Sequence, residues 1–222
     1  MNERLRKLQE IGQSVWIDSI SRDDLENGNL QRLIDEGVVG VTSNPTIFQK
    51  AISGSSLYDE QLQELAEKED DPKEIFFGLA GEDIRDACDL MMPVYERTNR
   101  LDGYVSLEVS PDLAYDTPAT VEEATRLHGL VNKPNLMVKI PATQPGLAAV
   151  EEMIATGHTI NVTLIFSLER YRAVAAAYIR GLQRLVAAGG NPSLVASVAS
   201  FFVSRVDTEA HRWIDEVGGP AE

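Results

Sequence analysis

The sequence predicts an α/β fold with parallel strands, because short apolar runs alternate with helical patterns along the whole chain. Each run is rich in Val, Ile or Leu, which is typical of parallel strands that are buried on both faces. The expected strands are residues 14–18, 38–42, 103–109, 136–140, 160–166 and 194–199. A longer helical insert, over about residues 57–100, separates the second strand from the third.

Several of the intervening helices have recognisable ends. Asp71 followed by Pro72 is the order of a cap and a first helical residue, and Thr120 with Glu123 has the spacing of a capping box. Ser167 should cap a long helix with one apolar stripe, and this helix should end at the glycines 189–190.

Polar residues within or near the ends of apolar strands favour a barrel over an open sheet. Glu108, Lys139, Asn161 and Thr163 have this position, and a (β/α)8 barrel builds its sites from the carboxyl ends of its strands. An open doubly wound sheet would more often carry a glycine-rich phosphate turn after its first strand, and none follows Asp18.

The number of strands predicts an incomplete barrel. Six strands are expected here, whereas a closed (β/α)8 barrel has eight over roughly 250 residues. We therefore expect residues 1–222 to form a single (β/α) barrel domain that lacks its last two βα units at the carboxyl end.

Composition narrows the function class. The net charge of −15 argues against nucleic acid as a partner, because binding a polyanion requires clustered Lys and Arg. No apolar run approaches the roughly 18 residues that a membrane span needs, so no membrane partner is expected and the chain is interpreted as soluble and cytoplasmic. A homo-oligomer remains possible.

No metal site or cofactor is expected. His128, His158 and His211 have no ligand spacing with one another or with Cys88, the single cysteine. Cys88 follows the apolar spacing of a helix, so we expect it to pack in the core.

Lys139 is the strongest candidate for chemistry. It lies in the apolar run of residues 136–140, where desolvation disfavours an ammonium ion and favours a neutral, nucleophilic amine. Such an amine attacks carbonyl groups and forms a Schiff base. The alternative is a lysine at a strand end, whose stem packs while its amine reaches water.

Two carboxylates could serve as acid and base beside such a lysine. Schiff-base chemistry on a sugar needs a proton shuttle for dehydration and a second group at the C–C bond that breaks. Glu108 is the candidate shuttle, because its apolar flanks favour the protonated acid, and Asp18 is the candidate for the second role. For each, the alternative is a carboxylate that caps the next helix or binds backbone amides.

Other polar residues could recognise the substrate. Asn44, Asn161 and Thr163 have the amides and hydroxyls that bind sugar hydroxyl groups, although Asn44 before a proline is also an ordinary turn residue. Ser200 and Arg205 are placed after the sixth strand, where an arginine could bind a phosphate. A surface position is the alternative for Arg205.

Two runs in this sequence resemble the signatures of the transaldolase family. Residues 40–48, Gly-Val-Thr-Ser-Asn-Pro-Thr-Ile-Phe, are similar to the first signature, and residues 137–149, around Lys139, to the second. The segments around residues 16–19, 106–109, 161–166 and 200–205 match in the same order, so the resemblance covers essentially the whole chain. Its details are most similar to the actinobacterial and cyanobacterial branch.

The resemblance implies a (β/α)8 barrel that transfers a dihydroxyacetone unit between sugar phosphates in the non-oxidative pentose phosphate pathway. It implies that Lys139 is the Schiff-base lysine, Glu108 the water-assisted acid and base, and Asp18 the group that moves the C4 hydroxyl proton. It further implies that Thr163 assists near Glu108 and that Arg205 binds phosphate. The dihydroxyacetone hydroxyls would be held by Asn44, Asn161 and Ser200.

The carboxyl end departs from the family pattern, because the segment that carries a second phosphate-binding arginine in the family has no counterpart here. Three alternatives to a transaldolase therefore stay open. One is a Schiff-base aldolase that acts on fructose 6-phosphate, and another is a non-catalytic fragment. The third is a portion of a longer or fused enzyme.

Overall fold

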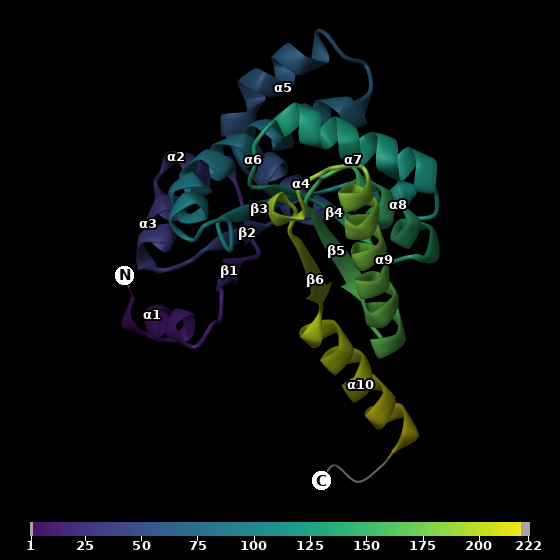
Figure 1. Cartoon of the computed structure of the whole chain (residues 1–222). Coiled ribbons are helices and arrows are strands. Elements are labelled where there is room, and N and C mark those ends of the chain that lie inside the picture. Colours follow the sequence, from purple (N-terminus) through teal and green to yellow (C-terminus); the bar gives the residue numbers. More distant parts are fainter. Residues whose placement is uncertain (1, 219–222) are drawn as a thin grey trace. The chain divides into compact units, whose positions relative to one another are not determined.

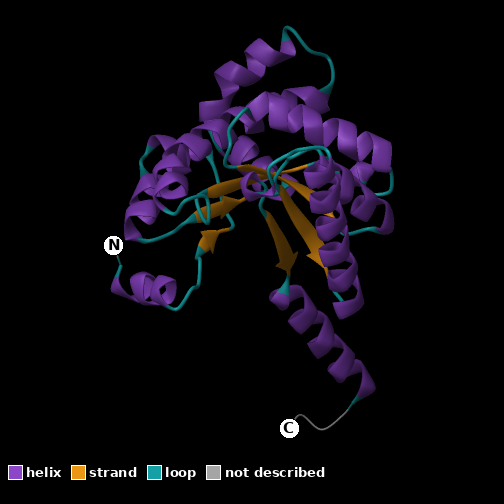
Figure 2. Cartoon of the chain, in the orientation of Figure 1, coloured by secondary structure: helices purple, strands orange, loops and turns teal. Residues whose placement is uncertain are grey.

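The computed structural model describes residues 2–218, and in that range six strands alternate with helices (Figures 1 and 2). The strands are β1 (Trp16–Ile17), β2 (Gly40–Thr42), β3 (Tyr104–Glu108), β4 (Leu136–Pro141), β5 (Ile160–Ile165) and β6 (Ser197–Phe201). Their order along the sheet follows the sequence, and the registers of β1 through β4 and of β5 with β6 are parallel. The predicted alternation of strand and helix is confirmed.

The chain forms two compact units. The first comprises Met1–Pro111 and Glu122–Lys139, and the second comprises Asp112–Val121 and Ile140–Glu222. Helix α7 (Thr117–Val131) and strand β4 each contribute residues to both. The expectation of one single domain stays a prediction, and the two units are described separately.

In the first unit, helices follow each of the strands β1 and β2, and the predicted helical insert is present. The helices of this unit before β3 are α1 (Glu3–Glu10), α2 (Arg22–Glu26), α3 (Asn29–Glu36), α4 (Pro45–Gly54), α5 (Asp59–Ala66) and α6 (Pro72–Arg97), with a short 3₁₀ helix, η1, at Ser56–Tyr58. Helix α6 begins where the sequence predicts, because the Asp71 side chain accepts a hydrogen bond from the Lys73 backbone N–H.

The core of the first unit lies between α6 and the strands. Val105, Leu107 and Met137 are fully or almost fully buried, as are Ile84 and Cys88 on α6. The expected core position of Cys88 is confirmed, and burial raises the pKa of its thiol.

A buried polar cluster attaches the helical insert to α2. The Asp83 carboxylate accepts hydrogen bonds from the Tyr58 hydroxyl at 2.6 Å and from the Arg22 guanidinium at 2.9 Å. The same guanidinium lies 4.5 Å from the centre of the Tyr58 ring. All three side chains thus have hydrogen-bond partners, yet burial still raises the pKa of the Asp83 carboxyl.

Gly40 allows β1 and β2 to approach closely. A Cβ atom at this position would lie 2.3 Å from the Trp16 indole, so any other residue would displace that ring. Trp16 and Gly40 are register partners, and the first strand therefore depends on a glycine in the second.

The start of α7 differs from the predicted capping box. The helix begins at Thr117, where the Asp116 side chain accepts a hydrogen bond from the Ala119 backbone N–H at 3.0 Å. Pro118 in the first turn completes the same signal that starts α6. Thr120 and Glu123 lie inside the helix, and their side chains bind backbone groups outside it.

The second unit contains α8 (Gln144–Ala155), β5, α9 (Leu168–Ala187), β6 and α10 (Val203–Val217). Ser167 caps α9 through the Arg170 backbone N–H, as predicted. The expected sixth strand starts too early, because Pro192–Leu194 forms a 3₁₀ helix capped by Asn191 and β6 begins at Ser197.

Strand β5 is irregular near its carboxyl end. Its register with β6 shifts between Val162 and Ile165, and Leu164 has a φ of 61°, which is the left-handed region. A bulge of this kind redirects the side chains next to it. Thr163 is buried, whereas Leu164 is exposed.

Helix α10 extends beyond the end of β6 (Figure 1) and has no buried residue. Its exposed apolar side chains are Val203, Val206, Trp213, Ile214 and Val217. Within residues 2–218, none of the helices is both long and apolar enough to cross a membrane.

Candidate active site

Lys139 lies in β4, the most completely buried strand among residues 2–218. Every residue of β4 is buried, and Lys139 is 4% exposed. Its amine donates a hydrogen bond to the Ser43 carbonyl oxygen at 2.8 Å and lies 3.2 Å from Glu108 Oε2. The sequence therefore predicts the burial of Lys139 correctly, but the amine has two oxygen acceptors rather than purely apolar surroundings.

The pairing of Lys139 with Glu108 follows from the strand register. Glu108 and Lys139 are directly opposite each other in the parallel ladder of β3 and β4. The Val109 backbone N–H donates to the Lys139 carbonyl at 3.1 Å, which continues the ladder past Glu108. Backbone hydrogen bonds therefore hold the carboxylate and the amine side by side.

Ser43 is a residue that the sequence analysis did not single out. Besides its carbonyl contact with Lys139, its buried hydroxyl donates to the Ser106 carbonyl on β3 at 2.6 Å. The available signal was its position in the first signature run, directly after the apolar strand β2.

Asn44 and Asp18 also lie at the carboxyl ends of their strands. The Asn44 side chain caps α4, where its Oδ1 accepts a hydrogen bond from the Ile47 backbone N–H at 3.0 Å. Asp18 follows β1 and is exposed. The structure thus gives Asn44 a structural role, and it brings Glu108, rather than Asp18, into contact with Lys139.

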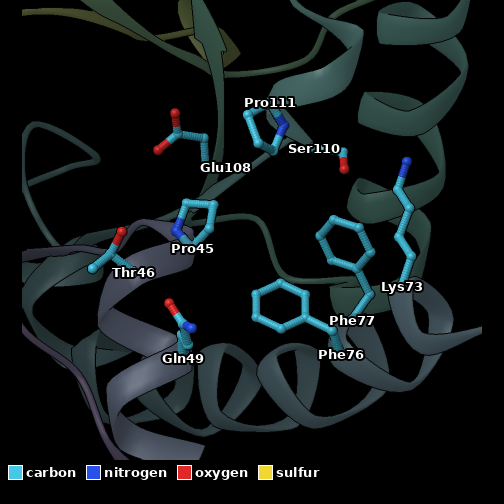
Figure 3. Close-up of a pocket in the computed structure, with 9 residues that line it drawn as sticks. All are labelled: Pro45, Thr46, Gln49, Lys73, Phe76, Phe77, Glu108, Ser110 and Pro111. Carbon is cyan, nitrogen blue, oxygen red and sulfur yellow. The ribbon is translucent and has the colours of Figure 1, made fainter.

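A pocket of about 330 Å³ opens beside Glu108 (Figure 3). Its floor is apolar and includes Phe76 and Phe77, whose rings are packed edge to face. Polar groups at its margin include Gln49, Glu108 and Lys73. Glu108 therefore lines a space that a small molecule can enter.

In the second unit, the structure brings Asn161 and Ser200 together. The Ser200 hydroxyl donates to Asn161 Oδ1 at 2.8 Å between the neighbouring strands β5 and β6. Asn161 is buried, and Ser200 lies within β6 rather than after it, which corrects the sequence interpretation. Thr163 is buried on β5, and its carbonyl accepts a hydrogen bond from the Ala142 N–H at 2.8 Å.

Arg205 lies in the first turn of α10 and is exposed. Its guanidinium lies 4.4 Å from the centre of the Phe202 ring, a cation–π contact, and it lines an open apolar pocket with Trp213 and Phe166. The predicted helix start after the sixth strand is confirmed, while phosphate binding by Arg205 stays a prediction.

The strand that carries Lys139 continues into a tight turn and helix α8. Thr143 caps this helix through the Gly146 backbone N–H at 3.0 Å. A Cβ atom at position 146 would lie 2.0 Å from the Pro141 carbonyl oxygen, so the turn requires a glycine. Thr143 and Gly146 of the second signature run therefore have a structural reason.

These features define a protein of the parallel βα class with a buried lysine and a carboxylate opposite each other at the ends of adjacent strands. The chain belongs to the transaldolase/fructose-6-phosphate aldolase family, whose family model matches residues 15–218. Six parallel βα units are consistent with a partial (β/α)8 barrel of this family, so the predicted fold class is confirmed.

Named relatives agree with the family. A transaldolase of Acidothermus cellulolyticus is 51% identical over 222 residues, which cover 100% of this chain and 60% of that protein. Transaldolases of Frankia alni and Mycobacterium tuberculosis are 50% and 48% identical and are covered to 60% and 58%. The predicted similarity to actinobacterial transaldolases is confirmed, and the chain spans about 60% of the length of these relatives.

Proposed function

We propose that this chain contributes the Schiff-base centre of a transaldolase. The enzyme would move a dihydroxyacetone unit from fructose 6-phosphate or sedoheptulose 7-phosphate to erythrose 4-phosphate or glyceraldehyde 3-phosphate. The observation that carries the proposal is the buried Lys139 amine, 3.2 Å from the Glu108 carboxylate on the adjacent strand.

The first half-reaction begins with attack of the Lys139 amine on the ketose carbonyl, which gives a carbinolamine. Glu108, through a water molecule, donates the proton that allows hydroxide to leave as water, and an imine forms. Removal of the C4 hydroxyl proton then breaks the C3–C4 bond, releases an aldose phosphate and leaves an enamine on Lys139. The protonated imine nitrogen accepts the electron pair in this step.

The second half-reaction reverses these steps with a different aldehyde. The enamine carbon attacks the acceptor carbonyl, the new alkoxide takes a proton, and water hydrolyses the imine to free Lys139. In the assignment that the family resemblance implies, Asp18 carries the C4 hydroxyl proton in both directions.

The remaining residues would bind the substrate. Asn44 uses its amide oxygen to cap α4, so in this assignment its amide nitrogen donates to a substrate hydroxyl. Asn161 and Ser200, already hydrogen-bonded to each other, would hold further dihydroxyacetone hydroxyls. Thr163 would assist the acid and base step, and Arg205 would bind the phosphate.

Borohydride trapping tests the proposal. Incubation with fructose 6-phosphate and sodium borohydride should reduce the imine and leave a dihydroxyacetone-derived adduct on Lys139, which peptide mass spectrometry would locate. An adduct on another lysine, or the absence of an adduct in a protein of the relatives' full length, would refute the assignment.

A second candidate function is a fructose-6-phosphate aldolase, which the description of the matching family also names. This enzyme would use the same lysine but release dihydroxyacetone to water. The two activities differ in their dependence on an acceptor aldehyde. Product formation that requires erythrose 4-phosphate supports the transaldolase, and free dihydroxyacetone without any acceptor supports the aldolase.

Whether the native protein is longer than this chain can be measured directly. The intact mass of the protein isolated from its own cells would distinguish a 24.4 kDa product from a larger or fused enzyme. The trapping experiment would then be performed on the native form.

A further inference from the structure

Glu123 on α7 is a buried carboxylate without a role in the proposed chemistry. It is 6% exposed, and its Oε1 accepts a hydrogen bond from the Ser110 backbone N–H at 2.5 Å. Ser110 follows Glu108 by two residues, on the segment that leaves β3. Glu123 therefore fixes the backbone two residues after Glu108, which we propose as acid and base.

The backbone after Glu108 is held at two consecutive positions. The Val109 N–H donates to the carbonyl of Lys139 itself, and the next N–H donates to Glu123. These two bonds connect the Glu108 segment to β4 on one side and to α7 on the other. Displacement of Ser110 would therefore move Glu108 relative to the Lys139 amine.

Lys73 neutralises the buried carboxylate. Its amine lies 2.6 Å from Glu123 Oε2, and the Arg126 guanidinium lies 3.8 Å from the same oxygen. Lys73 occupies the first turn of α6, where the helix dipole disfavours a positive charge. The ion pair with Glu123 explains this lysine, because burying the Glu123 carboxylate without a positive partner would destabilise the fold.

The same network shapes the pocket beside Glu108. Lys73, Phe77 and Ser110 all line this pocket (Figure 3). Arg126 lies 5.1 Å from the centre of the Phe77 ring and pairs with Glu74 at 2.9 Å. One turn of α7 therefore contacts both the pocket wall and the segment after Glu108.

We propose that Glu123, paired with Lys73, is a positioning residue that holds Glu108 beside the Lys139 amine through the Ser110 backbone. This inference rests on the proposed function, because it assigns to Glu123 an effect on Schiff-base formation. Glu123 does not touch the reacting atoms itself, so its effect must pass through Glu108.

A double-mutant cycle on the rate of adduct formation tests this coupling. Glu123→Ala should slow borohydride trapping of fructose 6-phosphate at Lys139 by roughly tenfold, since misplacing a catalytic group by about 1 Å can cost about a hundredfold. In a Glu108→Gln background, Glu123→Ala should cause no further slowing. Equal slowing in both backgrounds would show a general structural effect and overturn the proposal.

Two variants extend the test if Glu123→Ala folds poorly. Glu123→Gln keeps an oxygen that can accept from Ser110 and should restore most of the trapping rate. Lys73→Met leaves that bond but removes the counter-ion, and its trapping rate should lie between those of the wild type and Glu123→Ala.

The matched control is Lys133→Met, which breaks the pair with Asp89 and should change the trapping rate less than about twofold. A Gln variant as slow as the Ala variant would contradict the proposal.

Hydrogen exchange separates this proposal from the proposed function. Loss of the Ser110 bond should speed amide exchange in a peptide spanning residues 104–113 in Glu123→Ala, but not in Lys133→Met. If a protein of the relatives' full length forms no adduct on Lys139, the proposed function fails. Unchanged exchange in this peptide would independently refute the positioning role.

Discussion

Two pairs of neighbouring strands each hold two polar side chains in contact, Glu108 with Lys139 and Asn161 with Ser200. The first pair lies on strands that are almost entirely buried, and the backbone ladder places its two residues opposite each other. The second pair includes Ser200 on β6, a strand without a fully buried residue, which leads into the exposed helix α10. The first pair thus lies on buried strands, whereas the second lies partly on a strand that is only half-buried or exposed.

The largest expected difference between the two pairs is in the formation of the covalent adduct. Lys139→Met should abolish the borohydride-trapped adduct, because it removes the amine that we propose forms the imine. Asn161→Ala should only slow trapping, since the contact that we propose for Asn161 is to a substrate hydroxyl. Both are measured by intact mass against time. An adduct that persists at normal yield in Lys139→Met would show that the lysine has been misassigned.

A second comparison concerns stability. Leu107→Ala on β3, where Leu107 is 2% exposed, should reduce the free energy of unfolding by about 2–5 kcal/mol. Trp213→Ala on α10, where Trp213 is 65% exposed, should change it by less than about 0.5 kcal/mol. Urea titrations followed by circular dichroism would measure both. A large loss in Trp213→Ala would mean that α10 is covered in solution.

The bulge in β5 should produce a smaller change in stability, and there Gly should be more favourable than Ala. At an ordinary strand position Gly is less favourable than Ala, but Leu164 has a positive φ that strains a residue with a Cβ atom. Leu164→Gly should therefore be more stable than Leu164→Ala by about 1 kcal/mol. The same two substitutions at Val162 should show the opposite order. An Ala variant more stable than the Gly variant at position 164 would contradict the assigned backbone.

The smallest predicted effect depends on pH. Partial burial lowers the pKa of His158 below its usual 6.5, so the folded chain binds fewer protons than the unfolded chain in this range. The contribution of His158 to stability is present above pH 6.5 and is lost as the pH falls through its lowered pKa. The free energy of unfolding should be measured for wild type and His158→Gln at pH 7.5 and 5.5. Its decrease from pH 7.5 to 5.5 should be smaller for the variant. Equal decreases would exclude His158 as a source.

The sequence was sufficient to predict those parts of the fold that depend on local patterns. The apolar runs located all six strands, and Asp71 and Ser167 located the starts of two helices. Lys139 could be identified because a charge within a buried strand is rare. Its proximity to Glu108 was expected from strand ends alone, but the 3.2 Å contact depends on a register that local patterns do not encode.

Long-range contacts explain the parts that the sequence analysis missed. The spacing of Thr120 and Glu123 matched a capping box, yet Glu123 binds Ser110, a residue 13 positions earlier that is brought close by the path of the chain after β3. Ser43 has the small polar side chain of a turn residue, and its carbonyl meets an amine 96 positions away. Ser200 was placed outside its strand because the proline turn at Pro192–Leu194 shifts β6 along the chain.

The ladder that aligns Glu108 with Lys139 also makes the lysine a chemical probe of correct folding. Successive side chains of a strand point to opposite faces, so a slip of one residue between β3 and β4 would move the amine away from its carboxylate. A chain with that error could retain normal helix content, yet its Lys139 amine would lack the Glu108 carboxylate beside it. Covalent labelling at Lys139 would therefore count the molecules in a refolding mixture whose strands are aligned as in the native sheet, a distinction that circular dichroism cannot make.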